Sequence, residues 1–531
     1  MALSKLTSVA KSVAKKLLAI VVSSKDSIAD LRAYEPLMDG QQISLLGHTV
    51  KGVGGGKFWH DASDTTSTDN NGTVIVTSKG ERWKRQKNKN ITPEMFGSLK
   101  GSDNLAALNA ATLAIGTSGN LQLEGDYEVS APYSFEEKVG AKITCLGLVK
   151  ILSTDKTQEV MRLSGRLVTS TGMLETGYAE SVTLTIADTS AVGLLFTGLA
   201  RSNMGGLRQK HVGVGHKIAQ ETGFGFPNGQ NALFSNTFQY LDTSDFTYAA
   251  FDWRSFNGGS TGNAVLNWYM SNNVEGVANI CDRFGWIGTF SDLTIGQWNF
   301  ESAECRHLVT ISSDVDTIDA DTAHIENITP TNVNDGFFFL SNDVILNIGA
   351  MALIGNKFND TKAATYAVFR IADNTKVTVQ GISERDATVT GSPNVRMVRY
   401  AGAGVTEARV SVTNTNTTFV TNLEFGTPQG MDQALFVPRI YPLSGVLIQT
   451  DSSMTWGPQV TERTVVFQGL TVSRSFIINS LREYNGAACT IVNRDAIFNV
   501  NISETDVGFT HTLLPNTSVN IAFDGVNWGV V

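Results

Sequence analysis

An apolar pattern repeated in the middle of the chain constrains the fold more than any other feature of the sequence. The pattern is apolar, any, apolar, any, any, apolar, any, apolar, and successive copies begin 25, 28 and 31 residues apart. Its apolar positions are Leu293, Ile295, Trp298 and Phe300, then Ile318, Ala320, Ala323 and Ile325, then Leu346, Ile348, Met351 and Leu353, and finally Val377, Val379 and Ile382. Repeats of about 20 to 50 residues, with insertions confined to turns, are typical of solenoids.

The two apolar pairs within each copy predict a parallel β-helix. Side chains alternate between the faces of a strand, so each pair marks one short strand, and the shift in phase between the pairs marks a corner. Equivalent residues of neighbouring coils then stack ~4.8 Å apart. We therefore expect Leu293 to lie over Ile318, and the residues between the apolar positions to face outward in columns.

The sequence changes in character on both sides of the repeats, which predicts four parts. Residues 1–25 contain an apolar stripe at helical spacing and are expected to form a helix that either docks on a partner or packs on its own protein. Binding to a membrane surface is a third interpretation. Residues 26–90 form a small β module with Gly- and Asn-rich turns. Residues 91–435 form the β-helix with a capping helix at its start, and residues 436–531 form an antiparallel β domain. The predicted fold class is all-β.

Charge and hydropathy exclude several classes of partner. The net charge is -9, from 41 basic and 50 acidic residues, and gives no reason to expect nucleic acid. The apolar run from Leu17 to Val22 is too short to span a bilayer, and no cleavage site of a leader peptide follows it. The four cysteines lie too far apart to indicate a disulfide framework or a zinc site. We expect no membrane partner, no metal and no cofactor, and a sugar-like ligand fits best.

The outward columns bring acidic residues together. In the predicted register, Glu301 lies beside Glu326 on the neighbouring coil, and Asp319 and Asp321 lie on the same coil as Glu326. Glycoside hydrolysis needs one carboxyl group as acid and another as base or nucleophile, and the proximity of like charges separates their proton affinities. We take these four residues as the candidate catalytic group. The alternative is that outward acidic residues only keep a solenoid soluble.

Further residues are secondary candidates. The acidic or basic ones are Glu304, His324, Asp242, Asp245, Asp252 and Glu275. Two of these, Asp242 and Asp245, also fit turn positions. The candidates for substrate binding are Trp253, Trp268, Tyr269, Trp286, Asn299 and Arg385, since aromatic rings stack on sugars and polar groups bind their hydroxyls.

The order of the parts resembles a known family. Ile91-Thr-Pro-Glu-Met-Phe-Gly97, followed by the predicted helix from Asp103 to Ala111, resembles the start of the pectate-lyase-like right-handed β-helix of bacteriophage tailspikes and capsular polysaccharide depolymerases. The usual Gly-Asp-Gly-x-x-Asp-Asp motif is reduced here to Lys100-Gly-Ser-Asp103. The resemblance covers most of the chain in architecture but only about twenty residues in motif.

The resemblance implies a location and partners. It implies a homotrimer on the virion tail, held through the N-terminus by a tail or adaptor protein. Its C-terminal domain would serve trimerisation or carbohydrate binding. It also implies action outside the cell at the host surface, on a capsule or O-antigen polysaccharide.

The chemistry of the predicted site stays open between three functions. We favour hydrolysis by paired carboxylates, retaining or inverting. A lyase that eliminates across a uronate is the first alternative, in which Asp319, Asp321 and Arg385 would be the candidate groups. A tail protein that binds its receptor without cleaving it is the second alternative.

Overall fold

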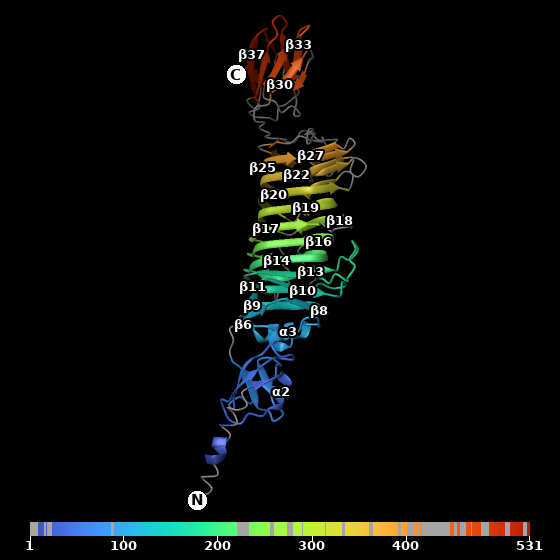
Figure 1. The fold of residues 1–531 in the computed structure, drawn as a ribbon. Helices are drawn as coiled ribbons and strands as arrows, with labels where there is room; N and C mark the ends of the chain where they lie inside the picture. Colours follow the sequence, from blue (N-terminus) through green and yellow to red (C-terminus); the bar gives the residue numbers. More distant parts are fainter. Residues whose placement is uncertain are drawn as a thin grey trace. The chain divides into compact units, whose positions relative to one another are not determined.

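The computed structural model divides into two compact units, residues 1–277 and 278–531, which we describe separately (Figure 1). The residues that the structure describes are 9–14, 17, 24–86, 90–170, 172–219, 233–254, 260–272, 280–288, 290–313, 315–331, 335–359, 365–390, 394–400, 408–412, 415–416, 446–450, 454–456, 464–468, 470–478, 488–504, 510–523 and 528–530. None of the helices within these ranges is long and apolar enough to cross a membrane. Residues 9–14 and 17 are helical, and Val9, Val13 and Leu17 are exposed; docking of this segment stays a prediction.

The first unit begins with a small sheet module. Its elements are β1 (Ser24–Lys25), α2 (Ile28–Ala33), β2 (Gln42–Leu45), β3 (Gly56–His60), β4 (Val74–Val76) and β5 (Arg82–Arg85). The sheet order is β1-β2-β3-β5-β4, antiparallel except for the β1–β2 pair. The module has its own core, made of Ile28, Leu31, Ile43, Leu45, Phe58, Ile75 and Trp83.

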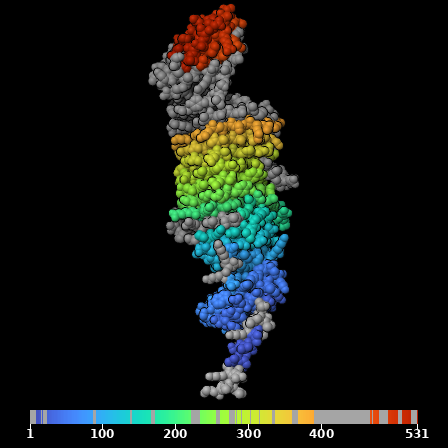
Figure 2. Space-filling view, turned by 60° about the vertical axis from the view of Figure 1, so that its left-hand side comes forward, coloured from blue at the N-terminus to red at the C-terminus, as the bar shows by residue number. Residues whose placement is uncertain are grey.

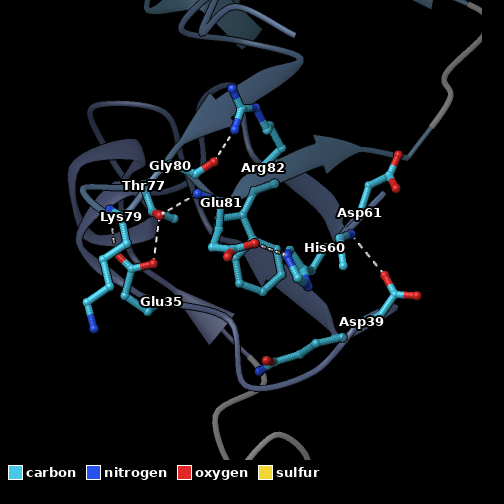
Figure 3. A network of polar contacts seen from close by, with 12 residues as sticks. Glu35, Asp39, His60, Asp61, Thr77, Lys79, Gly80, Glu81 and Arg82 are labelled. Carbon is cyan, nitrogen blue, oxygen red and sulfur yellow. Dashed lines mark hydrogen bonds and ion pairs between the residues drawn. The ribbon is translucent and has the colours of Figure 1, made fainter. Parts of the chain in front are cut away.

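Polar side-chain contacts stabilise the turns of this module (Figure 3). His60 is buried, and its Nε2 lies 2.8 Å from Glu81 Oε2. Glu35 accepts hydrogen bonds from the hydroxyls of Thr77 and Ser78 and from the backbone N–H of Lys79. Although burial raises the pKa of Glu35, these hydrogen bonds lower it by more, so the net direction is downward. The turns are therefore held by an ionised carboxylate.

The start of the β-helix packs against the module. Its elements are β6 (Asn90–Ile91), the 3-10 helix η1 (Pro93–Phe96) and α3 (Leu105–Ala114). A Cβ added to Gly72 would lie 2.3 Å from the Phe96 ring, so the module approaches η1 too closely for any side chain there. The predicted helix forms, and Leu108 and Ala111 of α3 are buried.

Parallel strands stack in coils through the rest of the first unit. They are β7 (Asn120–Leu123), β8 (Asp126–Val129), β9 (Tyr133–Cys145), β10 (Leu148–Ser153), β11 (Met161–Ser170), β12 (Met173–Tyr178), β13 (Val192–Ala200), β14 (Asn203–Ile218), β15 (Leu233–Phe234), β16 (Thr237–Arg254) and β17 (Asn263–Ser271). Buried asparagines stabilise the corners: Asn236 Nδ2 donates to Leu199 O and to Asn263 Oδ1, both at 3.0 Å.

The second unit contains the repeats found in the sequence (Figure 2, yellow-green to orange). Its coil strands are β18 (Ile280–Gly288), β19 (Asp292–Ile311), β20 (Thr317–Pro330), β21 (Asp335–Leu340), β22 (Ile345–Ile354), β23 (Lys357–Asn359), β24 (Thr365–Ile371), β25 (Thr375–Arg385), β26 (Thr388–Thr390), β27 (Asn394–Tyr400), β28 (Ala408–Val412) and β29 (Thr415–Asn416). In parallel register, Leu293 pairs with Ile318, Ile318 with Leu346 and Leu346 with Val377. The predicted parallel β-helix and its register are confirmed.

The C-terminal part of the second unit forms two sheets. Their strands are β30 (Val446–Thr450), β31 (Met454–Trp456), β32 (Thr464–Gln468), β33 (Arg474–Ile478), β34 (Ala488–Asn493), β35 (Val500–Glu504), β36 (Thr510–Leu513), β37 (Thr517–Phe523) and β38 (Trp528–Val530). The expected antiparallel pairs occur at β34–β37, β37–β38 and β35–β36. The preceding strands pair in parallel, which the sequence did not predict: β30–β32–β34 and β31–β33–β35.

Candidate functional site

Strands β19 and β20 place two glutamates side by side on the outer surface of the second unit. Phe300 and Ile325 point into the core and are fully buried, so the next residue of each strand, Glu301 and Glu326, points outward. The two glutamates are register partners in neighbouring coils, and both are half-buried. The sequence prediction of their stacking is therefore confirmed.

An imidazole completes this group. His324 Nε2 lies 2.8 Å from Glu326 Oε2, and the two side chains are 32% and 35% exposed. One donor or acceptor atom from each of Glu301, His324 and Glu326 lies within 4.8 Å of the others. We call these three residues the Glu-His-Glu group. Two carboxylates and one imidazole can share protons with a bound substrate, and among the described residues they are also the set placed to hold a divalent cation.

Local backbone geometry fixes the position of Glu326. Asn327, the next residue, has φ 55°, a left-handed conformation that asparagine tolerates and that ends the straight segment. Its side-chain amide also donates to Glu326 Oε1 at 3.4 Å. The corner therefore follows directly on the carboxylate and orients it.

Two predicted binding residues share the outer columns of this site. Asn299 is the register partner of His324 and is half-buried. Arg385 is exposed and lies in the column of the two glutamates, because Glu326 pairs with Ile354 and Ile354 pairs with Arg385. Two coil spacings, or about 10 Å, separate the backbones of Glu326 and Arg385.

Three other predicted acids lie outside the Glu-His-Glu group. Asp319 and Asp321 are exposed and precede the corner, and Asp319 Oδ1 accepts a hydrogen bond from Asn347 at 2.8 Å. Glu304 lies beyond the next corner of β19, with Thr329 as its register partner. Both aspartates lie in the same strand as Glu326, but among the described residues the set of groups within 4.8 Å of one another consists of Glu301, His324 and Glu326. A part of Asp319 and Asp321 in catalysis stays a prediction.

The secondary acidic candidates that the structure describes in the first unit, Asp242, Asp245 and Asp252, each form an ion pair. Asp242 is 3% exposed and accepts from Arg208 Nε at 2.7 Å. Asp252 is held by two hydrogen bonds of 2.7 Å from Arg254. Asp245 has φ 54° and lies 3.8 Å from Lys210 Nζ, as the alternative interpretation of a turn residue predicts. Glu275 lies outside the described residues.

The aromatic candidates divide between core and surface. Trp253 and Trp268 are 0% exposed, so the prediction that they bind sugar is wrong. They pack with the buried His216, whose Nδ1 accepts a hydrogen bond from Trp253 Nε1 at 2.8 Å. Tyr269 is half-buried, and Trp286, 8% exposed, lies beneath the guanidinium of Arg283.

Sequence reasoning also missed one charged column. In the first unit, Asp126 pairs in register with Lys150, Lys150 with Glu175, Glu175 with Arg208 and Arg208 with Asp242. We call this set the alternating column. Its five members share only a position in the coil, and no regular spacing in the sequence reveals it.

The fold is a parallel β-helix carrying a small sheet module, and comparison with known proteins relates this chain to phage tail proteins. Residues 24–88, which contain the whole module, match the family model described as the phage tail protein small four-stranded beta-sheet domain. The resemblance to phage proteins that the sequence indicates is thus confirmed for this segment.

One curated relative and two solved structures are similar to longer parts of the chain. The chain is 39% identical over 113 residues to the capsule K2-specific depolymerase of Klebsiella phage vB_KpnP_KpV74, which is 21% of this chain and about a fifth, 19%, of that protein. Tailspike protein 2 of Escherichia coli O157:H7 bacteriophage CAB120 is 17% identical, with a TM-score of 0.45 over 75% of this chain and 52% of that chain. The Acinetobacter phage vB_ApiP_P1 tailspike protein is 13% identical, with a TM-score of 0.46 over 96% and 90%.

Proposed function

We propose that this chain is a phage tailspike that binds and depolymerises a bacterial surface polysaccharide. The phage-tail match of residues 24–88 supports attachment to a virion tail, directly or through an adaptor protein. The relative named a capsule depolymerase supports the activity. The protein then acts outside the cell at the host surface, as a homotrimer, and residues 446–530 contribute the β-rich end of the chain.

The observation that carries the enzymatic proposal is the register of Glu301 over Glu326. Like charges directly opposite each other on neighbouring strands are destabilising. The register of the two carboxylates does not by itself stabilise the fold, and proteins break such rules mainly at functional sites. We infer that the pair is retained for proton transfer.

We infer different roles for the two glutamates from their contacts. His324 Nε2 lies 2.8 Å from Glu326 Oε2 and, in the tautomer that carries a proton on Nε2, donates a hydrogen bond to it. Glu326 is then the nucleophile or base, and Glu301 is the acid that protonates the leaving oxygen. The close approach of the two side chains, within 4.8 Å, fits the ~5–5.5 Å between carboxyl groups of retaining enzymes better than the ~6.5–9.5 Å of inverting enzymes.

A lyase is the second candidate, and the contact between His324 and Glu326 is the observation that favours it. A carboxylate that orients an imidazole makes a base able to remove a proton next to a uronate carboxylate. Elimination leaves an unsaturated uronate, whereas hydrolysis leaves a saturated one, so the products distinguish the two reactions.

The test incubates the full-length protein with a panel of capsule and O-antigen polysaccharides and measures polymer size by chromatography. The proposal expects one polymer to shorten, with new reducing ends and no rise in the ultraviolet absorbance of unsaturated uronates. New ends with that absorbance would establish the lyase. Binding without shortening of any polymer on a broad panel would leave only a receptor-binding role.

A further inference from the structure

A column of arginine and aromatic side chains runs along the second unit on a different straight segment from the two glutamates. Trp286 of β18 pairs in register with Thr310 of β19, Thr310 with Phe339 of β21, and Phe339 with Arg370 of β24. Thr310, Phe339 and Arg370 are partly exposed, and their neighbours Ile311, Leu340 and Ile371 are buried core residues.

Aromatic rings of this column position two guanidinium groups. One belongs to Arg370, a member of the column, and the other to Arg283, which lies in the same strand as Trp286. The Arg283 guanidinium lies 4.3 Å from the centre of the Trp286 ring, and its NH1 donates to Thr310 Oγ1 at 2.8 Å. The Arg370 guanidinium lies 5.0 Å from the centre of the Phe339 ring. A guanidinium stacked on a ring loses side-chain freedom before any ligand binds, while the hydrogens at its edge still point away from the ring. Stacking therefore preorganises both arginines as donors.

The charge of this column differs from that of the chain as a whole. The protein carries a net charge of -9. The four register positions of the column hold tryptophan, threonine, phenylalanine and arginine, so none is acidic. The two guanidinium groups lie two to three coils apart, or ~10–14 Å along the stack. Such a spacing suits a ligand that repeats its negative charge along an extended chain.

We propose that Arg283, Trp286, Thr310, Phe339 and Arg370 form a binding surface for an anionic polysaccharide. The guanidinium groups pair with carboxylate, phosphate or pyruvyl oxygens of the polymer, for which the planar fork of arginine is well shaped. The accessible part of Phe339 packs against the sugar rings, and Thr310 holds Arg283 in place. This inference deepens the proposed function, since it names the class of substrate, but it concerns binding and not cleavage.

Binding is measured in the full-length Glu301→Gln variant, so that cleavage cannot remove the ligand. The probes are purified capsular polysaccharides bearing uronate, phosphate or pyruvyl groups, neutral capsules, and carboxyl-reduced forms of the uronate polymers. We expect binding of an acidic polymer that weakens as salt rises. Carboxyl reduction abolishes binding if uronate is the charged group and leaves it intact if phosphate is.

Substitutions then locate the surface. Arg283→Ala and Arg370→Ala should each weaken binding about 10-fold, as expected for the loss of a hydrogen bond between charged groups. Lys376→Ala, at an exposed cation of β25 outside the column, should bind like the parent. Hydrogen exchange of β21 and β24 checks that the coils remain folded in each variant.

The inference is overturned if the double variant Arg283→Ala/Arg370→Ala binds as tightly as its parent. It is also overturned if only neutral polymers bind, or if none of the acidic polymers binds. Failure of the proposed function has a different signature: the wild-type protein would bind an acidic polymer through these arginines and leave its length unchanged.

Discussion

The alternating column of the first unit and the Glu-His-Glu group of the second unit use the same stacking for opposite purposes. In the alternating column, each charge meets an opposite charge on the next coil, and Glu175 and Asp242 are 4% and 3% exposed. In the Glu-His-Glu group, Glu301 meets a like charge and both partners are half-buried. Opposite charges in register favour one alignment of the coils, whereas the like charges in register belong to the site that we propose for catalysis.

Removing Arg208, the cation between Glu175 and Asp242 in the alternating column, should have the largest effect on stability. Arg208 Nε lies 2.7 Å from Asp242, and its NH1 lies 3.8 Å from Glu175. Burial raises the pKa of Asp242, and the carboxylates of Glu175 and Asp245 raise it further, so the net direction is upward although Arg208 lowers it. Arg208→Ala leaves two buried carboxylates without this cation, and we expect a loss of about 3–5 kcal/mol in unfolding free energy.

Hydrogen exchange of β12, β14 and β16 measures that loss locally. Arg254→Ala is a useful comparison, because it removes an arginine that pairs with Asp252, outside the alternating column. Unchanged protection of these strands in Arg208→Ala would show that the alternating column does not stabilise the coils.

Acid should weaken the first unit through His216. Burial lowers the pKa of His216 from 6.5 to about 3, so the folded protein binds fewer protons there than the unfolded chain between these values. Stability from the neutral imidazole is complete above pH 6.5 and is lost as pH falls, by roughly 3 kcal/mol at pH 4. Protonation would also break the hydrogen bond from Trp253 to Nδ1.

Unfolding temperatures of the wild type and His216→Gln between pH 7 and pH 4 check this expectation. The wild type should lose more stability across this range than the variant, because glutamine does not titrate. Equal slopes for the two proteins would mean that His216 does not determine the acid sensitivity.

Neutralising one member of the glutamate pair should slightly stabilise the second unit. Glu326→Gln removes a like-charge contact that is in register with Glu301. We expect a gain of about 0.2–1 kcal/mol, and hydrogen exchange of β19 and β20 measures it. Asp321→Asn, at an exposed carboxylate of the same strand, should change little. A loss of protection in Glu326→Gln would indicate that the pair stabilises the fold.

The repeats explain how much of this site could be predicted. The apolar pattern from Leu293 onward fixes which residues stack, so it also places Glu301 beside Glu326 and Asn299 beside His324. It does not fix which outward side chains of one coil meet, so the sequence alone could not separate the Glu-His-Glu group from Asp319 and Asp321.

The first unit was harder to predict because its coils are irregular. Strands β14 and β16 bend through several corners, and the register shifts between Val212 and Val214. No period therefore shows which aromatic residues face inward, so the sequence does not reveal that Trp253 and Trp268 are fully buried. The arginines that neutralise Asp242 and Asp252 were missed for the same reason.

The most direct test of the catalytic proposal compares the release of reducing ends by the wild type, Glu301→Gln, Glu326→Gln and Asp321→Asn, using the polymer that the wild type degrades. Each glutamate variant should lose about 100-fold or more in rate while remaining folded, and Asp321→Asn should keep the wild-type rate. Full turnover by both glutamate variants would contradict the assignment of this pair as acid and nucleophile.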